Sequence, residues 1–313
     1  RIKTKSAGKK DRFIKIIPLV LILGLAAGGA GISTVSSIDM ATSNAASGTI
    51  SPYWDETCEW LKNNTPDTGI PIYDNYSWGK TYESAKPYAI MSWWDYGYYI
   101  MELAKRMPTS NPGQARAGDV ARILLDSDEK SITEQLEALE VKYVIINEEM
   151  SSPFIPAICT WADPDAGINP YITLLQNAEG SIGTLYSPAL YQSLLTRLYC
   201  YDGSSMHPEQ VGVIHTMPSI DGVQRIESME VFDGAEKAAK AVDIYNQKAE
   251  EMGNGKYTYP ASVDGNLPSV NLDAFTCFRL VHESPFSHVK TFEFVNGARI
   301  SGEGTIECEG TTD

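Results

Sequence analysis

An uncharged run from Ile16 to Val35 restricts what this chain can fold into more than any other feature. It is twenty residues long. At about 1.5 Å per residue, a helix of that length spans the hydrocarbon core of a bilayer, which is about 30 Å thick. Pro18 falls in the first turn, where its missing N–H costs little. We therefore predict one transmembrane helix over residues 16–37.

The charges on either side of this run predict its orientation. Residues 1–15 hold seven Lys or Arg and one acid, a charge of +6, so a net charge of −15 leaves −21 on the rest. The positive-inside rule makes residues 1–15 a cytoplasmic flank and sends the body to the external face of the cell membrane. A secretory signal peptide has the same basic-then-apolar order, but its apolar region is usually about 7–15 residues long. Both interpretations place the body outside the cytoplasm, and its acidity argues against nucleic-acid binding.

Strand and helix patterns alternate along the body, which predicts an α/β (mixed α+β) fold. Residues 87–92 and 141–146 have the composition of buried strands. Helices are expected at 51–62, 96–107, 113–125, 131–139, in much of 165–200 and at 233–252. Asp233 is the expected N-cap of the last helix, and Gly253 ends it.

Strand patterns dominate the C-terminal part. They cover residues 275–281 and 288–295, and Asn296-Gly297 predicts a hairpin turn into a strand from Arg299. We therefore expect an α-rich central domain at 38–225 and a helix plus β-rich peripheral module at 226–313. Because the chain begins with Arg1 rather than Met, we expect it to be a fragment of a longer protein or a processed product.

Cysteine and histidine spacing predicts no metal site. The five cysteines form no C-x-x-C pair, so one disulfide or a set of buried free thiols remain the alternatives. The four histidines show no spacing such as H-E-x-x-H. We expect structural roles for them: His207, His215, His282 and His288.

The chemically distinctive stretch is Ser92–Tyr99, with the sequence SWWDYGYY. Indole N–H groups and a carboxylate can both hydrogen-bond a hydroxyl group, and the surrounding rings exclude water. Gly97 permits a close backbone approach or a tight turn. The alternative interpretation is ordinary packing, because aromatic residues after a strand usually enter the core and Asp95 stands where an N-cap is expected.

WWDYG at residues 93–97 resembles the signature pentapeptide of oligosaccharyltransferase catalytic subunits, and the chain is similar to the C-terminal part of the archaeal AglB family. Three further segments resemble that family in the same order: residues 191–198, 278–284 and 289–294. The resemblance covers about residues 50–305. It implies a membrane glycosyltransferase that transfers a lipid-linked oligosaccharide to Asn in Asn-X-Ser/Thr sequons.

The resemblance also implies a role for each residue of the motif. Trp93, Trp94 and Asp95 are expected to bind the Ser or Thr hydroxyl of the acceptor, and Tyr96 and Gly97 to form the scaffold that shapes the turn. A site built around such a hydroxyl can reject an analogue that lacks it by about 10⁴–10⁵.

A second motif of the family corresponds to residues 147–158 in this chain. The Lys usual in its other forms is absent, and Phe154 stands near its place. Met150, Phe154 and Ile158 could form an apolar wall for the methyl group of Thr. Ordinary core packing is the alternative for all three.

The resemblance places catalysis outside this chain. The family holds its catalytic carboxylates and a divalent metal, Mn²⁺ or Mg²⁺, in membrane-region loops that precede this part of the sequence. We therefore predict no catalytic and no metal-binding residue here. The implied partners are an acceptor polypeptide with Asn-X-Ser/Thr, a dolichyl-linked oligosaccharide donor and the membrane. Two internal sequons, at residues 63–65 and 75–77, are candidate acceptors themselves.

Two other functions fit the same residues. One is a membrane-anchored, non-enzymatic surface protein with an aromatic patch that binds peptide or glycan. The other is a carbohydrate-binding domain in which Trp93 and Trp94 stack on sugars. Preference for Asn-X-Thr over Asn-X-Ala peptides distinguishes the enzyme from both.

Overall fold

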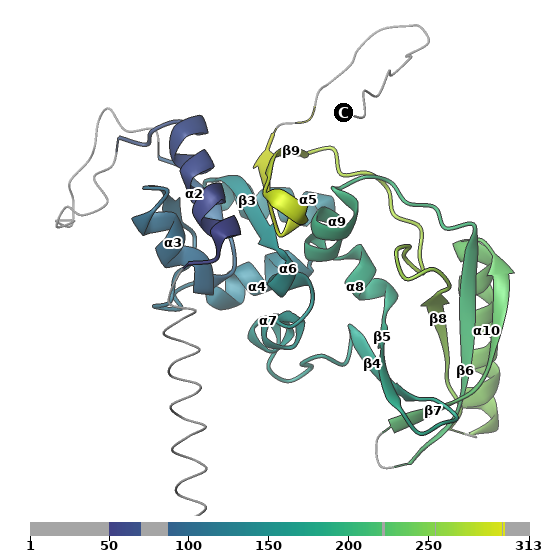
Figure 1. Ribbon diagram of the computed structural model, residues 1–313. Helices are drawn as coiled ribbons and strands as arrows, with labels where there is room; N and C mark the ends of the chain where they lie inside the picture. The colour runs from purple at the N-terminus through teal and green to yellow at the C-terminus, as the bar shows by residue number, and fades with distance from the viewer. Residues whose placement is uncertain (1–49, 70–86, 221–222, 254, 296, 298–313) are drawn as a thin grey trace, which may run out of the picture. The chain divides into compact units, whose positions relative to one another are not determined.

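The computed structural model describes residues 50–69, 87–220, 223–253, 255–295 and 297. They form a mixed α/β unit with two mixed sheets, which confirms the α/β class (Figure 1). The expected transmembrane helix at 16–37, its flank at 1–15 and the strand from Arg299 lie outside the described residues. Of the helices that the structure describes, none is both long enough and apolar enough to cross a bilayer.

The first sheet is built on β3 (Val141–Asn147). Its order is β2-β1-β3-β10-β9, with β1 and β2 parallel to their neighbours and the last two strands antiparallel. β3 is almost completely buried, as its continuous apolar sequence predicts for a central strand. The other strands are β1 (Ala89–Met91), β2 (Met107–Pro108), β9 (Phe278–Glu283) and β10 (Val289–Phe294).

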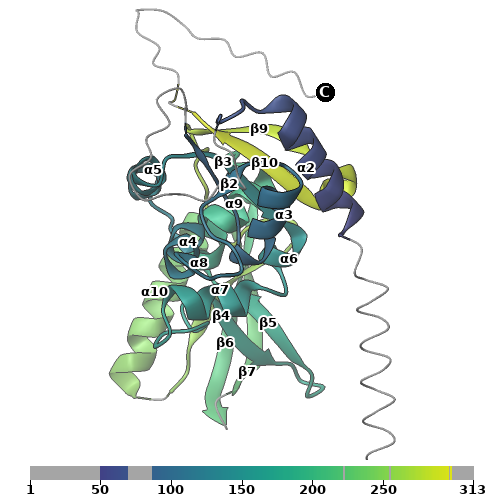
Figure 2. The ribbon, with the colours of Figure 1, turned by 90° about the vertical axis from the view of Figure 1, so that its left-hand side faces the viewer.

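Helices surround this sheet. α5, α6 and α9 contact β3, and α4 packs against α7 and α9. α2 lies beside β9 and β10 (Figure 2), where His282 and Glu56 form a 3.1 Å hydrogen bond. The helices are α2 (Pro52–Asn64), α3 (Gly97–Glu102), α4 (Ala117–Leu125), α5 (Glu129–Ala138), α6 (Glu148–Ser151), α7 (Ile155–Ala162), α8 (Pro188–Gln192) and α9 (Leu194–Tyr201), with short 3₁₀ turns η1 (Trp94–Tyr96) and η2 (Pro285–Ser287).

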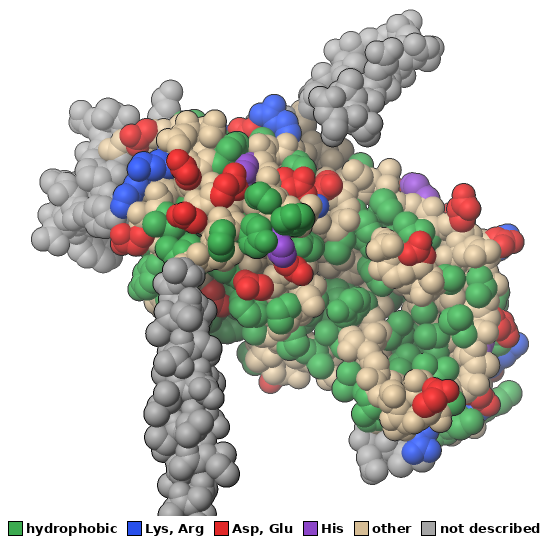
Figure 3. All heavy atoms as spheres, in the orientation of Figure 1, with side chains coloured by type: hydrophobic (Ala, Val, Ile, Leu, Met, Phe, Trp, Pro, Cys, Tyr) green, Lys and Arg blue, Asp and Glu red, His purple; other side chains and the backbone are tan. Residues whose placement is uncertain are grey.

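The second sheet has the order β5-β4-β7-β6-β8 and is covered on one face by α10 (Ala235–Met252). The opposite face carries large apolar side chains, and Met229 and Val231 are about half exposed there. Figure 3 shows hydrophobic side chains gathered over this region. The strands are β4 (Ile172–Gln176), β5 (Ile182–Tyr186), β6 (Gln210–Ile220), β7 (Val223–Asp233) and β8 (Thr258–Ser262).

Several element predictions are confirmed and others need correction. The helix predicted at 96–107 ends at Glu102, because Lys105 takes a left-handed φ of 54° and β2 then pairs with β1. Pro108 is tolerated there because β2 is an edge strand. Residues 165–200 are not mainly helical: the β4–β5 hairpin precedes two short helices.

The last long helix begins two residues later than predicted. Asp233 is the final residue of β7, and Gly234 with φ 84° is the N-cap of α10. Only Ala235 and Ala238 of this helix are buried, as its lack of large apolar anchors suggests. Its predicted end at Gly253 is confirmed.

The predicted domain boundary at residue 225 falls inside β7, at a residue paired with both Met217 and Gln176. β10 pairs with β3, so the C-terminal strands complete the sheet that begins with β1. The two sheets therefore draw on residues from both sides of position 225.

Candidate acceptor-binding site

The WWDYG motif forms the turn between β1 and α3. Trp93 is extended, residues 94–96 form η1, and α3 begins at Gly97. A Cβ at Gly97 would lie 2.3 Å from the backbone oxygen of Ser110. Only glycine allows this close approach at position 97.

Asp95 is held at the surface of this turn rather than sealed in the core. Its side chain is half-buried, whereas Trp93 is 1% exposed. Burial raises the pKa of Asp95, a hydrogen bond from Trp93 opposes that rise, and the negative charge of Glu149 adds to it. Trp93 therefore supports the carboxylate from the protein side and leaves Asp95 partly open to solvent.

Trp94 supplies a hydrogen-bond donor that the described residues leave unused. Its ring lies 5.9 Å from Trp93 and 6.5 Å from Trp161 between centroids. Its indole N–H is buried and has no hydrogen-bond partner in the described part of the chain. A buried polar group left unpaired costs about 1–3 kcal/mol, and such a group at the edge of a site is suited to a ligand atom.

Tyr96 ties the motif to the second segment that the sequence singled out. Its ring stacks on Trp54 at 4.3 Å, and its hydroxyl donates to the carboxylate of Glu149. Asn147 donates to the Tyr96 hydroxyl at 2.8 Å and to Glu149 at 3.0 Å. Burial, followed by the hydrogen bond to Glu149, raises the pKa of Tyr96. The turn that carries the motif and helix α6 are thus joined by a hydrogen-bonded network.

Sequence reasoning missed four members of this neighbourhood: Trp54, Asn147, Glu149 and Trp161. One local signal pointed to Asn147, because Asn is a favoured N-cap at the junction of a strand and a helix, and its side chain accepts a hydrogen bond from the N–H of Met150 at 3.2 Å. The contacts of the other three depend on tertiary packing alone.

The three candidate residues of the second motif lie at different depths. Met150 and Ile158 are 0% exposed, and the Ser92 hydroxyl contacts the Met150 sulfur at 3.8 Å. Phe154 is half-buried, and its ring faces Tyr96 at 6.5 Å. Of the three, Phe154 is therefore the one that is partly open to solvent, while Met150 and Ile158 lie in the core.

The described residues contain no group of three or more His, Cys, Asp or Glu side chains able to hold a metal ion. His282 stacks on Trp60 at 4.7 Å, and His288 stacks on Tyr53 at 4.0 Å. Four cysteines are free, while Cys308 lies outside the described residues. The Mn²⁺ or Mg²⁺ implied by the resemblance therefore has no fitting ligand set here.

The Thr of the first internal sequon, at residues 63–65, is buried in the folded chain. Thr65 is 7% exposed, and its hydroxyl donates to the Leu61 carbonyl at 2.5 Å. Its oxygen also accepts from Arg106 at 2.9 Å. The second sequon, at 75–77, lies outside the described residues.

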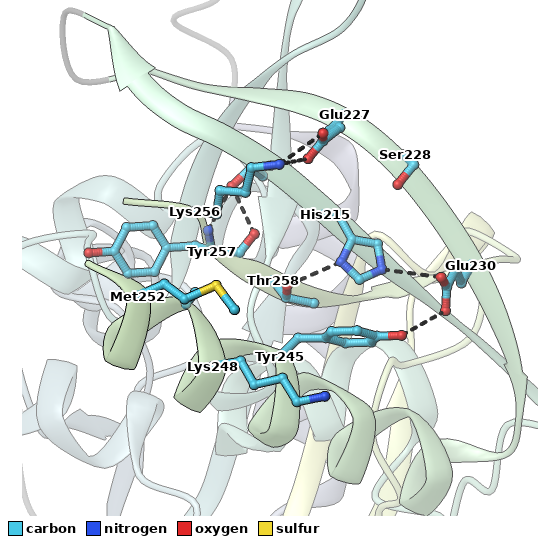
Figure 4. A pocket seen from close by; sticks show the side chains of 12 residues that line it. His215, Glu227, Ser228, Glu230, Tyr245, Lys248, Met252, Lys256, Tyr257 and Thr258 are labelled. Atoms are coloured by element: carbon cyan, nitrogen blue, oxygen red, sulfur yellow. Dashed lines mark hydrogen bonds and ion pairs between the residues drawn. The ribbon is translucent and has the colours of Figure 1, made fainter. Parts of the chain in front are cut away.

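A polar cavity of about 310 Å³ lies between α10 and the second sheet, formed by residues other than those of the motif (Figure 4). Figure 4 shows the ring of His215 meeting Tyr245 edge to face, with Glu230 3.8 Å from the imidazole. Lys256 bonds to Glu227 at 2.9 Å. In the cavity wall, the Lys256 ammonium thus pairs with the Glu227 carboxylate, and His215 lies beside the Glu230 carboxylate.

Comparison with known proteins places the motif in a family. Residues 51–151 match the family described as the AglB core domain. The chain is 26% identical over 348 residues to the dolichyl-monophosphooligosaccharide–protein glycotransferase AglB of Haloferax volcanii. This similarity covers 92% of this chain and 32% of the relative. The chain thus spans about a third of the length of the curated relatives it matches.

Two solved structures of oligosaccharyltransferases from Archaeoglobus fulgidus are also similar, each at 18% identity. One, in complex with Zn and sulfate, has a TM-score of 0.44 and covers 78% of this chain and 35% of that chain. The other, AglB in complex with an inhibitory peptide and a dolichol-phosphate, has a TM-score of 0.46 and covers 95% and 37%.

The sequence of residues 51–151, which includes the motif, is similar to the AglB core domain. Over about a third of each relative, the chain is similar in sequence to AglB of Haloferax volcanii and to a dolichyl-phosphooligosaccharide-protein glycotransferase of Archaeoglobus fulgidus.

Proposed function

We propose that this chain is the acceptor-recognition part of an oligosaccharyltransferase that glycosylates Asn in Asn-X-Ser/Thr sequons. The observation that carries the proposal is the pairing of a half-buried carboxylate, Asp95, with the unpaired indole N–H of Trp94 on one 3₁₀ turn. A side-chain hydroxyl is both donor and acceptor, so it can satisfy these two groups at once.

Each residue of the motif then has a defined part in binding. The Asp95 carboxylate accepts a hydrogen bond from the hydroxyl group, the Trp94 indole N–H donates one to the hydroxyl oxygen, and Trp93 holds the carboxylate in place. An acceptor with Ala at this position leaves both protein groups unpaired in a partly desolvated site. That penalty is the physical basis for rejecting Asn-X-Ala.

Transfer of the glycan belongs to other parts of the protein. The dolichyl-linked oligosaccharide and the Mn²⁺ or Mg²⁺ ion are bound, in this proposal, by membrane-region residues absent from this chain. The segment at 16–37 anchors the described unit on the external face of the membrane.

The test uses the full-length protein and fluorescent acceptor peptides with Thr, Ser or Ala two residues after Asn. Wild type is expected to glycosylate the Thr and Ser peptides and not the Ala peptide. Asp95→Asn and Trp94→Phe should each raise the peptide KM by tenfold or more. Tyr98→Phe is the matched control, because Tyr98 is 50% exposed beside the motif and is expected to keep wild-type kinetics.

A rival follows from the half-buried ring of Trp94 and the neighbouring exposed ring of Trp161, which could stack on a sugar. It predicts that residues 50–313 bind free glycan with no dependence on the sequon. Equal use of Thr and Ala peptides by the full-length protein would overturn the proposed function.

A further inference from the structure

A second cavity, of about 370 Å³, lies beside α6 and is lined largely by tyrosines. Its apolar wall includes Ile155 and Leu190. The aromatic residues that line it are Tyr186, Tyr191, Tyr199 and Tyr201. Burial raises the pKa of Tyr191 and raises that of Tyr199 to about 12, so both hydroxyls stay protonated donors at neutral pH. Tyrosine combines a large apolar surface with a polar tip, a composition suited to peptide side chains.

Helix α6 separates this cavity from the motif. Successive residues of a helix are about 100° apart, so Glu149 and Ser151 point to opposite sides. Glu149 accepts from Tyr96, Ser151 lines the cavity, and Met150 between them is buried in the core. The chain continues from Phe154, which faces Tyr96, directly into Ile155 of the cavity wall.

The width of α6 therefore sets the spacing between the two places. A helix with its side chains is about 10–12 Å across, and an extended peptide advances about 3.3 Å per residue. A polypeptide bound at Asp95 needs about three to five residues to cross α6 and reach the cavity.

The charges around the cavity disfavour an acidic occupant. Lys290 is 6% exposed, and its ammonium donates to the Tyr199 carbonyl at 3.0 Å and to Asp202 at 2.6 Å. Glu283 lies 3.7 Å from the same ammonium. Two carboxylates thus face one cation, which leaves no positive charge for an anion and favours an uncharged side chain.

We propose that the cavity is a second acceptor subsite, which binds an aromatic or large aliphatic side chain three to five residues after the sequon Ser/Thr. The downstream direction follows because the two residues before the Ser/Thr, including Asn, must reach the catalytic centre. This inference rests on the proposed function, and it adds a preference that lies outside the sequon.

The experiment compares Asn-X-Thr peptides that carry Phe, Leu, Ala or Asp at the third, fourth or fifth residue after Thr, with full-length protein. Burial of an apolar side chain predicts a KM about tenfold lower for Phe or Leu than for Ala at one of these positions. Asp there should be the poorest substrate. Each peptide is also made with Ala in place of Thr, to follow sequon recognition separately.

Two variants alter the cavity and one serves as the control. Gly265→Trp adds a side chain where a Cβ meets nothing within 4 Å, and should remove the preference for Phe and Leu. Tyr191→Ala enlarges the cavity and should weaken the same preference. Gly183→Trp is the matched control, since a Cβ there also meets nothing within 4 Å but Gly183 lies in β5, outside this cavity.

The outcomes separate the two proposals. A Phe or Leu preference that is lost in Gly265→Trp or Tyr191→Ala, kept in Gly183→Trp, and accompanied by intact Thr dependence supports the subsite. No downstream preference in wild type, or one unchanged in both cavity variants, overturns the subsite while Thr dependence preserves the proposed function. Loss of Thr dependence in wild type overturns both.

Discussion

At the scale of single residues, Asp95 shows how a site is made from conflicting demands. Its carboxylate is partly desolvated and lies near the charge of Glu149, which disfavours ionisation, while Trp93 favours it. The ionised carboxylate is the stronger acceptor for a hydroxyl group, because a hydrogen bond to a charged oxygen is stronger than one to a neutral carboxyl group. In the proposed function, this position serves acceptor binding at the expense of the stability of the folded chain.

A pH dependence follows from the direction of this shift. Because the pKa of Asp95 is raised above its ordinary value of 3.8, acceptor KM should increase with falling pH earlier than for an unperturbed Asp. Glu149→Gln removes one cause of the rise, so its acid limb should move to lower pH. The measurement is peptide KM against pH for wild type and variant.

The raised pKa of Asp95 affects the stability of the folded chain in the opposite direction to acceptor binding. A carboxyl group whose pKa is raised on folding makes the folded state relatively less stable as pH increases above the unfolded value. Asp95→Asn should therefore not lower Tm at neutral pH. A large drop in Tm would mean that Asp95 is a structural cap, and an acid limb unmoved by Glu149→Gln would contradict the electrostatic account.

At the scale of elements, the end of α2 depends on one buried arginine. Arg106 is 4% exposed and donates to the carbonyls of Lys62 at 3.1 Å and Thr65 at 2.8 Å. It also donates to the hydroxyls of Thr65 and Tyr88, each at 2.9 Å. The last carbonyls of a helix have no partner within it, so Arg106 satisfies groups that α2 leaves open.

Arg106→Met should destabilise the unit by about 3 kcal/mol, because several buried acceptors lose a charged donor. Urea unfolding of residues 50–313 measures the change. The control is Arg122→Met, since Arg122 is 55% exposed and pairs only with Asp119, an ion pair expected to contribute about 0–1 kcal/mol. Equal effects of the two substitutions would show that the buried network adds nothing.

At the scale of the whole molecule, long-range pairing assembles the site. Strand β3 leads into α6, and strand β1 leads into η1. The parallel pairing of β1 with β3 therefore places the motif beside Asn147 and Glu149. β10 and β9 then close the other side of β3 with residues from the end of the chain. Segments about 50 and 150 residues apart in sequence thus meet around one strand.

Membrane attachment is a prediction at this scale. Residues 1–313 should remain in the membrane pellet after alkaline extraction, whereas residues 50–313 should be released. Leu21→Lys together with Leu23→Lys should weaken insertion, because Lys near the middle of a span costs about 2.5–3.5 kcal/mol. A product cleaved after residue 37 and found in the soluble fraction would favour the signal-peptide alternative.

The sequence by itself determined the features that rest on local chemistry. The mainly apolar composition of β3 and the shared face of Trp54, Cys58 and Leu61 on α2 were predictable from neighbours in the chain. The need for glycine at position 97, in contrast, comes from the approach of the Ser110 backbone. The residue types of the motif at 93–97 allow hydrogen bonding to a hydroxyl group, while the acceptor Ser or Thr as ligand came from the family resemblance and stays a prediction.

Only the tertiary structure decided which side chains meet. The β4–β5 hairpin replaced a predicted helical region because strand pairing with β7 outweighed leucine spacing that fits either period. The unpaired N–H of Trp94, the charge of Glu149 near Asp95 and the tyrosine cavity beyond α6 depend on residues distant in sequence. Local preferences are weak compared with burial and hydrogen bonding between elements, so these contacts could not be read from the chain alone.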